Sequence, residues 1–207
     1  MNGGDKMCGR YELLFNHNND EIQRILDLAS KNNPEVFFEP KEIFPSAIAP
    51  VILSSGHKIS IEFARWGFPG MQKNEWIINA RSETVSQKPK FRQSFHVRRC
   101  VIPATGFYEW THDSQKKKYK FHIPDHKNIY MAGIWNEYNG EKHFVILTTA
   151  ANHSMAPIHN RMPLIIPKEV IRSWIYDAEA ASSFLTQPSP ELIAQNVDPY
   201  EQLTFSF

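Results

Sequence analysis

The stretch RCVIPATGFYEW, residues 99–110, is a run of β-branched and aromatic residues interrupted by a proline and a glycine. This composition is typical of two short strands separated by a turn. Similar runs follow at 118–124, 128–135 and 143–150, with turn-forming residues between them. Because these strands crowd the middle of the chain, we predict a mainly β core.

Helical patterns lie on both sides of this core, at 167–175 and 179–185 and near the start of the chain. Residues 20–30, behind a possible cap at Asn19, follow a helical period, and their apolar side chains fall on one face: Ile22, Ile25, Leu26 and Ala29. Residues 58–65 alternate strictly between apolar and polar, which predicts a half-buried strand. The chain is therefore predicted to form a single α+β domain.

The chain has 207 residues, of which 42% are hydrophobic and 22% charged, and its net charge is +1. That length suits one domain with a substantial core, and the composition excludes a mainly disordered chain. Because the charge is nearly balanced, a nucleic-acid site would have to be a local patch. Cys8 and Cys100 form no disulfide framework, and no run resembles a signal peptide or reaches membrane-spanning length. We expect a cytoplasmic protein without membrane contact.

The motif MCGRY contains the first cysteine, Cys8. A lone cysteine is most often a small buried hydrophobe. If translation begins at Met7, however, removal of the initiator leaves Cys8 with a free α-amine beside its thiol, and Arg10 favours the thiolate. Such a pair condenses with an aldehyde to form a thiazolidine. We therefore interpret residues 1–6 as a leader or a misassigned start, and residues 7–207 as the domain.

Two strand-like segments carry polar side chains that could do chemistry. In GFYEW, alternation turns Glu109 to the same apolar face as Phe107, which favours a raised pKa and an acid/base role; the alternative is a strand-edge carboxylate facing water. In INARSETV, Asn79 could position a reacting group and Arg81 could contact a phosphate. The alternative there is a helix cap at Asn79 and a solvated pair between Arg81 and Glu83.

A third candidate segment, residues 151–166, is apolar and bounded by prolines except where His159 and Arg161 interrupt it. A lone histidine is more often structural than catalytic. His153 and His159 lie six residues apart, which fits no usual zinc spacing, and no cysteine lies nearby. We therefore expect no metal site.

The stretch KPKFRQSFHVRR, residues 88–99, interleaves basic and aromatic side chains. It is interpreted either as a solvated loop and strand edge or as a groove that follows phosphates, with Phe91 and Phe95 stacking on bases and Arg98 among its cations. Residues 114–118, SQKKK, are predicted to form a charged hairpin tip. Trp66, in RWGFPG, could be core or a stacking platform.

Six motifs occur in the order of one known family: MCGRY, ARWGFP, INARSETV, FRQSFHVRRCVIPATGFYEW, ILTTAAN and IHNRMPLII. Together they resemble the SRAP domain, named for SOS-response-associated peptidases. The resemblance covers the chain from residue 7 to about residue 170. It implies a compact α+β domain around a curved, mainly antiparallel sheet or barrel with flanking helices. It also implies recognition of abasic sites in single-stranded DNA and covalent capture of the ring-opened sugar aldehyde.

The family's residues map onto this sequence motif by motif. The resemblance assigns its catalytic positions as follows: Cys8, Asn79, Glu109 and His159. Its DNA-facing positions are matched by Arg10, Arg81, Trp66 and Pro45, to which we add Arg161 and Arg98 as expected DNA contacts. The expected partner is single-stranded DNA carrying an abasic site, bound by a monomer without metal or organic cofactor, near the nucleoid if the source is bacterial.

The implied reaction begins with opening of the closed sugar, for which Glu109 and His159 would move the protons. The Cys8 amine then forms an imine, and the thiolate closes the ring. Two alternatives remain open: a cysteine peptidase with Cys8 as nucleophile and His159 as base, able to process its own leader, and a non-covalent single-stranded DNA-binding module. With residues 1–6 in place, the Cys8 nitrogen is an amide and cannot form an imine.

Overall fold

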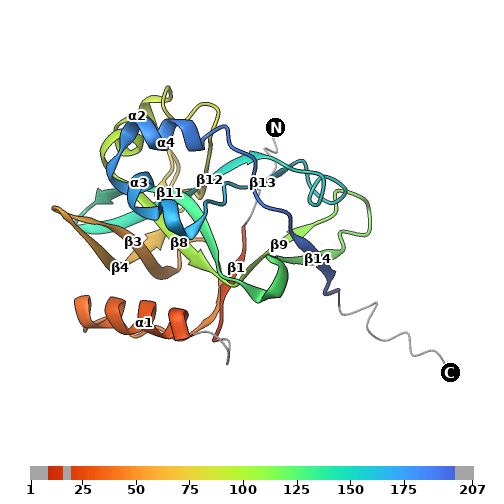
Figure 1. Cartoon of the computed structure of the whole chain (residues 1–207), viewed down its shortest axis with the longest axis horizontal. Coiled ribbons are helices and arrows are strands. Elements are labelled where there is room, and N and C mark those ends of the chain that lie inside the picture. Colours follow the sequence, from red (N-terminus) through yellow and green to blue (C-terminus); the bar gives the residue numbers. More distant parts are fainter. Residues whose placement is uncertain (1–8, 16–19, 199–207) are drawn as a thin grey trace.

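The computed structural model describes residues 9–15 and 20–198, and two sheets form most of it (Figure 1). The smaller sheet has five strands in the order β14-β10-β9-β1-β2, all antiparallel. Their bounds are Tyr11–Leu13 (β1), Lys41–Ile43 (β2), Gly106–Trp110 (β9), Lys118–His122 (β10) and Ile193–Asn196 (β14).

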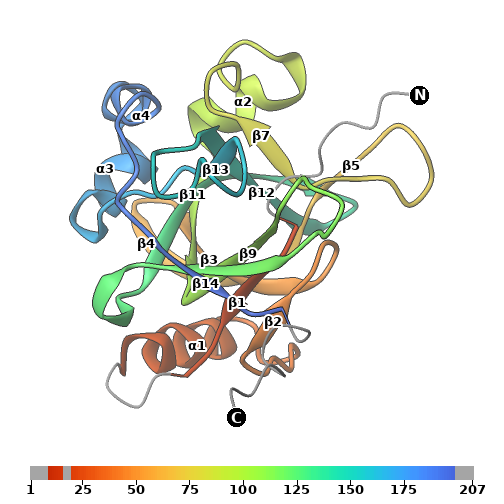
Figure 2. The same cartoon turned by 90° about the vertical axis from the view of Figure 1, so that its right-hand side faces the viewer.

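The larger sheet has seven strands, in the order β11-β8-β3-β4-β12-β13, with β7 paired to β12 and β11 also paired to β12. Their bounds are Ile48–Ser55 (β3), Lys58–Trp66 (β4), Asn79–Arg81 (β7), Arg99–Ala104 (β8), Ile129–Tyr138 (β11), Glu141–Ala150 (β12) and Arg161–Pro163 (β13). Strand β12 runs parallel to β4 and β7, whereas the other pairs are antiparallel. A two-stranded ribbon of β5 (Phe68–Pro69) and β6 (Trp76–Ile77) completes the strands. Figure 2 shows the sheets curving around a shared interior.

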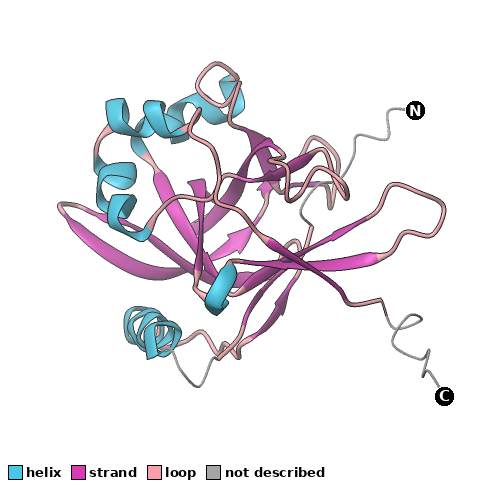
Figure 3. Cartoon of the chain, turned by 45° about the vertical axis from the view of Figure 1, so that its right-hand side comes forward, coloured by secondary structure: helices cyan, strands magenta, loops and turns pink. Residues whose placement is uncertain are grey.

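The helices lie outside the strands (Figure 3). Helix α1 (Asp20–Asn32) lies on one side of the molecule, and α2 (Pro89–Val97), α3 (Ile171–Tyr176) and α4 (Ala178–Phe184) gather on the other (Figure 1). Two 3₁₀ turns are η1 (Pro124–His126) and η2 (Lys168–Val170). No helix within the described residues is long and apolar enough to cross a membrane. The predicted mixed α+β domain with a mainly antiparallel sheet is confirmed.

Strand β8 of the larger sheet is buried on both faces. In β8, Cys100 and Ile102 belong to one apolar cluster, which also contains Tyr11 and Phe107, while Val101 between them belongs to a second cluster. All six residues of β8 are buried, because the smaller sheet covers one face and the helices cover the other. A strand buried on both faces loses the apolar-polar alternation, and this explains the continuous apolar run seen in the sequence.

The stretch 88–99 differs from its prediction. It forms helix α2, which begins with Pro89 in its first turn, a position where the missing proline N–H costs nothing. Phe91 and Phe95 are buried in the core, so they are not available to stack on bases. Arg99 is also buried, and its guanidinium donates to backbone carbonyls of four residues: Phe95, His96, Trp174 and Ile175. The predicted base-stacking groove is therefore wrong, because both phenylalanine rings are buried. Arg99 instead joins the ends of α2 and α3.

A candidate DNA-processing site between the two sheets

Glu109 lies in β9 with its side chain buried, at 4% exposure. Along β9, Phe107 and Glu109 share one face by alternation, and Phe107 belongs to the core cluster inside the molecule. The expected apolar-face position of Glu109 is therefore confirmed, and the alternative of a carboxylate facing water is wrong. A buried carboxyl group in this setting is suited to proton transfer.

Asn79 opens strand β7, so it does not cap a helix. The register places Asn79 opposite Ile146, a residue of the same core cluster as Phe107. Residues opposite one another in register share a face of the sheet, so Asn79 faces the interior that Glu109 also faces. In Figure 2, β7 and β12 lie on one side of this interior and β9 and β1 on the other.

The chain just after Cys8 passes beside this strand. A β-carbon placed on Gly9 would lie 3.9 Å from Cδ1 of Ile78, the residue immediately before Asn79. Cys8 itself lies outside the described residues. The first described residue therefore lies next to the segment that carries Asn79.

His159 is buried, at 3% exposure, in the loop between β12 and β13. The backbone N–H of Arg161 donates to His159 Nδ1 at 3.0 Å, and this nitrogen also lies 3.2 Å from the Arg161 carbonyl oxygen. Because the backbone hydrogen is fixed, it favours Nδ1 as the acceptor and leaves the proton of the neutral ring on Nε2. The ring of His112, three residues beyond Glu109, lies 4.5 Å from the His159 ring. This contact brings the end of β9 to the His159 loop.

The expected basic contacts differ in their availability. Arg81 is exposed, whereas the Arg161 guanidinium makes a two-pronged contact with Glu83. That contact is the main reason why the pKa of Glu83 lies below its ordinary value. Glu83 is therefore hydrogen-bonded to Arg161 rather than held as a simple pair with Arg81. Arg98 donates to Asn136 Oδ1 at 2.7 Å.

Arg10 lies on the outer side of the smaller sheet. Its backbone carbonyl accepts from Tyr108 N–H, so by register it shares the face opposite to that of Glu109. Its guanidinium carbon is 4.4 Å from the Phe44 ring centroid and 5.1 Å from that of Trp110, and Nη1 is 3.4 Å from Glu42 Oε2. Pro45 is half-buried in the turn that follows Phe44.

The sequence model of one family, "SOS response associated peptidase (SRAP)", matches residues 7–200. This chain belongs to the SRAP family. A curated relative named abasic site processing protein YoqW, from Bacillus subtilis, is 32% identical over 94% of this chain and 92% of its own. Abasic site processing protein YedK of Escherichia coli is 28% identical over 82% and 79%. A crystal structure of a protein from Bacteroides thetaiotaomicron superposes with a TM-score of 0.74 at 22% identity and covers 93% of both chains, which supports the same fold.

Trp66 of this SRAP chain is a core residue. Its side chain has 0% exposure, stacks on Phe144 and meets the edge of Tyr11. Its Nε1 donates to the carbonyl of Ile78 at 3.0 Å. The expectation that Trp66 faces DNA needs correction, because a fully buried ring offers no surface to a base. Trp66 instead supports the segment that leads into Asn79.

His112 was not expected in the site. The sequence places it beside the polar hairpin tip, and only the return of the 151–160 loop brings His159 to it. Within residues 9–15 and 20–198, no cluster of three or more His, Cys, Asp or Glu side chains could hold a metal ion. Cys100 is buried, and burial raises the pKa of its thiol far above the ordinary value.

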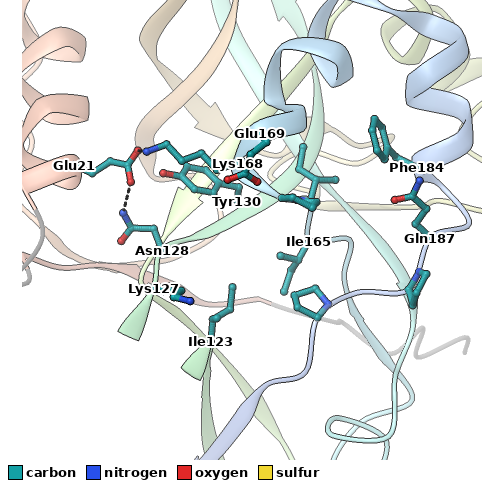
Figure 4. A pocket seen from close by; sticks show the side chains of 14 residues that line it. Glu21, Ile123, Lys127, Asn128, Tyr130, Ile165, Lys168, Glu169, Phe184 and Gln187 are labelled. Atoms are coloured by element: carbon teal, nitrogen blue, oxygen red, sulfur yellow. Dashed lines mark hydrogen bonds and ion pairs between the residues drawn. The ribbon is translucent and has the colours of Figure 1, made fainter. Parts of the chain in front are cut away.

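A pocket of about 500 Å³ lies elsewhere, among α1, β11, η2 and α4 (Figure 4). Its walls are largely apolar, and at one end Glu21 pairs with Lys168 and accepts from Asn128 Nδ2 at 3.1 Å. None of the expected site residues lines it. The pocket and the candidate site are therefore separate features of this SRAP domain.

Proposed function

We propose that this protein recognises abasic sites in single-stranded DNA and captures the ring-opened sugar covalently through Cys8. Membership of the SRAP family and relatives named abasic site processing proteins support DNA-lesion processing. The observation that carries the proposal is the shared interior of Asn79 and Glu109, with residue 9 passing beside Ile78. We further propose that the protein acts as a monomer on single-stranded DNA and needs no cofactor.

Proton transfer comes first. The closed sugar opens when its O1 hydroxyl loses a proton and O4 gains one, which frees the C1′ aldehyde. Glu109 and His159 are both buried, so each can hold a proton away from bulk water at a defined position. His159 would present Nε2, since Nδ1 accepts from the Arg161 N–H.

Covalent capture follows. The Cys8 α-amine adds to C1′, and loss of water leaves an imine. The Cys8 sulfur then adds to the same carbon, the thiol proton passes to the nitrogen, and a thiazolidine ring closes. Asn79 would position the amine through its side-chain amide, and the exposed Arg81 would contact a neighbouring phosphate.

This chemistry requires Cys8 to be the first residue, because an amide nitrogen cannot form an imine. We propose that the domain begins at Met7, in line with the start of the family match at residue 7. Ordinary removal of the initiator methionine would then expose Cys8.

The test uses protein that begins at Cys8 and a single-stranded oligonucleotide carrying one abasic site. We expect a heat-stable adduct with this DNA and none with the intact oligonucleotide. Cys8→Ala should abolish the adduct while changing DNA affinity little, because phosphate contacts dominate affinity. Cys8→Ser keeps the amine and should give an imine that borohydride traps.

A second arm keeps residues 1–7, and this longer protein should bind abasic DNA without trapping it. Equal crosslinking to both oligonucleotides, or strong crosslinking by the longer protein without release of its leader, would refute the mechanism. Cleavage before Cys8 that disappears in Glu109→Ala would instead favour a self-processing peptidase.

A further inference from the structure

The geometry points to Glu83 as a positioning residue that acts on His159 through Arg161. This role rests on the proposed function, because its outcome is the rate of crosslinking. Neither the catalytic positions nor the DNA-contact positions considered above include Glu83. Its place is nevertheless specific: it lies four residues after Asn79 and two after Arg81, in the turn that follows β7.

Glu83 and Arg161 form a fork-to-fork contact. Arg161 Nη1 donates to Glu83 Oε1, and Arg161 Nη2 donates to Oε2 at 2.9 Å. Two parallel charge-assisted bonds fix the plane of the guanidinium as well as its position. The Arg161 side chain is 14% exposed and that of Glu83 is 48% exposed. The half-exposed carboxylate therefore covers a cation that is mostly buried.

The Arg161 guanidinium also contacts strand β12. Arg161 Nη2 donates to the Thr148 carbonyl at 2.7 Å, and Thr148 is fully buried in β12. Thr148 lies opposite Arg81 in the register of β7 and β12. Arg161 in β13 therefore joins the turn after β7 to β12, at the position beside Arg81.

The link from Arg161 to His159 runs through the backbone. The Arg161 N–H that donates to His159 Nδ1 belongs to the residue whose side chain Glu83 holds. The guanidinium is fixed at three acceptor atoms, and this anchors the Arg161 backbone in addition to its pairing with Ala150 of β12. The backbone donor that selects the Nε2–H tautomer is held with it. Glu83 thus helps to set which ring nitrogen of His159 carries the proton.

Removal of the Glu83 charge separates this role from DNA binding. Glu83→Gln can keep only one of its two acceptor bonds, so the Arg161 guanidinium gains freedom to rotate. The same change removes a negative charge near the expected phosphate path, which should not weaken attraction to DNA. We therefore expect slower chemistry without lost affinity.

The experiment compares Glu83→Gln with Glu141→Gln. Glu141 accepts from Arg65 Nε and Nη2, both at 3.1 Å, so it makes the same kind of surface fork away from His159. Crosslinking is followed at saturating protein on abasic single-stranded DNA, and affinity is measured by anisotropy on intact DNA. We expect Glu83→Gln to slow crosslinking by about tenfold with affinity preserved, because small displacements of a reacting group are costly in rate. Glu141→Gln should change neither quantity.

A spectroscopic arm reports on His159 directly. Nitrogen-15 NMR of the imidazoles should show the Nε2–H tautomer for His159 in the parent and in Glu141→Gln, and a mixture of tautomers in Glu83→Gln. The inference fails if the parent crosslinks but Glu83→Gln keeps both its rate and its tautomer. It also fails if rate, affinity and melting temperature fall together, since that pattern indicates a purely structural contact. A parent protein that never crosslinks refutes the proposed function, and the tautomer measurement then decides the Glu83 role alone.

Discussion

The ring of His112 lies against the ring of His159, with 4.5 Å between their centroids and 39° between their planes. His112 is exposed and His159 is buried, so the first ring stands between the second and solvent. This contact connects the end of β9, which carries Glu109, with the loop that carries His159. Among the described residues, this ring contact joins the segment of Glu109 to the segment of His159, both of which carry expected catalytic residues.

Replacement of His112 should affect the site through packing. His112→Ala removes the ring that covers His159, and we expect crosslinking to slow several-fold while affinity for intact DNA stays the same. His112→Phe keeps a ring of similar size and should retain most of the rate. Single-turnover crosslinking of both variants measures this. If Phe fails as badly as Ala, the imidazole of His112 takes part in the chemistry rather than in packing.

The exposed guanidinium of Arg81 should act as a phosphate contact. Arg81→Ala should lower the slope of log affinity against log salt by roughly 0.7, the value for release of one counterion from a single strand. Arg24 is exposed on α1 and lies outside the expected DNA contacts, so Arg24→Ala serves as the matched loss of one positive charge and should leave the slope almost unchanged. Anisotropy titrations between low and moderate salt give both slopes. Equal slopes for Arg81→Ala and the parent would remove Arg81 from the DNA interface.

Trp66 should contribute to stability rather than to direct DNA contact. Trp66→Ala would leave a cavity between Tyr11 and Phe144 and remove one of the hydrogen bonds to the Ile78 carbonyl, at a cost of about 3–5 kcal/mol in unfolding free energy. Trp76 is half-buried and stacks on His143, so Trp76→Ala should cost less. Urea unfolding measures both variants. A Trp66→Ala protein with parental stability but weakened DNA affinity would restore the DNA-facing role.

The contact between Glu83 and Arg161 should make stability depend on pH in the acid range. The hydrogen bond from Arg161 lowers the pKa of Glu83 in the folded protein. A carboxyl group with a lowered folded pKa stabilises the protein above its unfolded pKa, about 4.3, and loses that contribution as the pH falls through the folded value. Glu83→Gln should therefore be less stable than the parent at pH 7, and the difference should shrink below about pH 4. Urea midpoints from pH 3 to pH 7 measure this, and a constant difference would contradict it.

Much of the fold follows from short-range patterns. The apolar stripe of residues 20–30 predicts α1, and its four apolar residues are buried as expected. The alternation of residues 58–65 predicts β4, and the middle runs predict β8 to β12. The prediction failed at α2, where Lys90 and Arg92 on either side of Phe91 obscured the helical spacing of four residues from Phe91 to Phe95. Basic residues on the outer face of a helix resemble a phosphate-binding loop when the apolar face is not seen.

The sequence by itself determined which residue types are candidates for the proposed chemistry: a cysteine near the start, an asparagine, a glutamate on an apolar face and a histidine in an apolar loop. It also determined the order of motifs from which the SRAP family is identified. Only the tertiary structure decided which side chains meet. Arg161 finds Glu83 across 78 positions, and His112 finds His159, because the register of strands far apart in sequence sets these neighbours. Local periodicity indicates the face on which a residue lies. The side chain that it contacts across the sheet depends instead on how whole strands align, and the energy of that alignment is spread over the entire core.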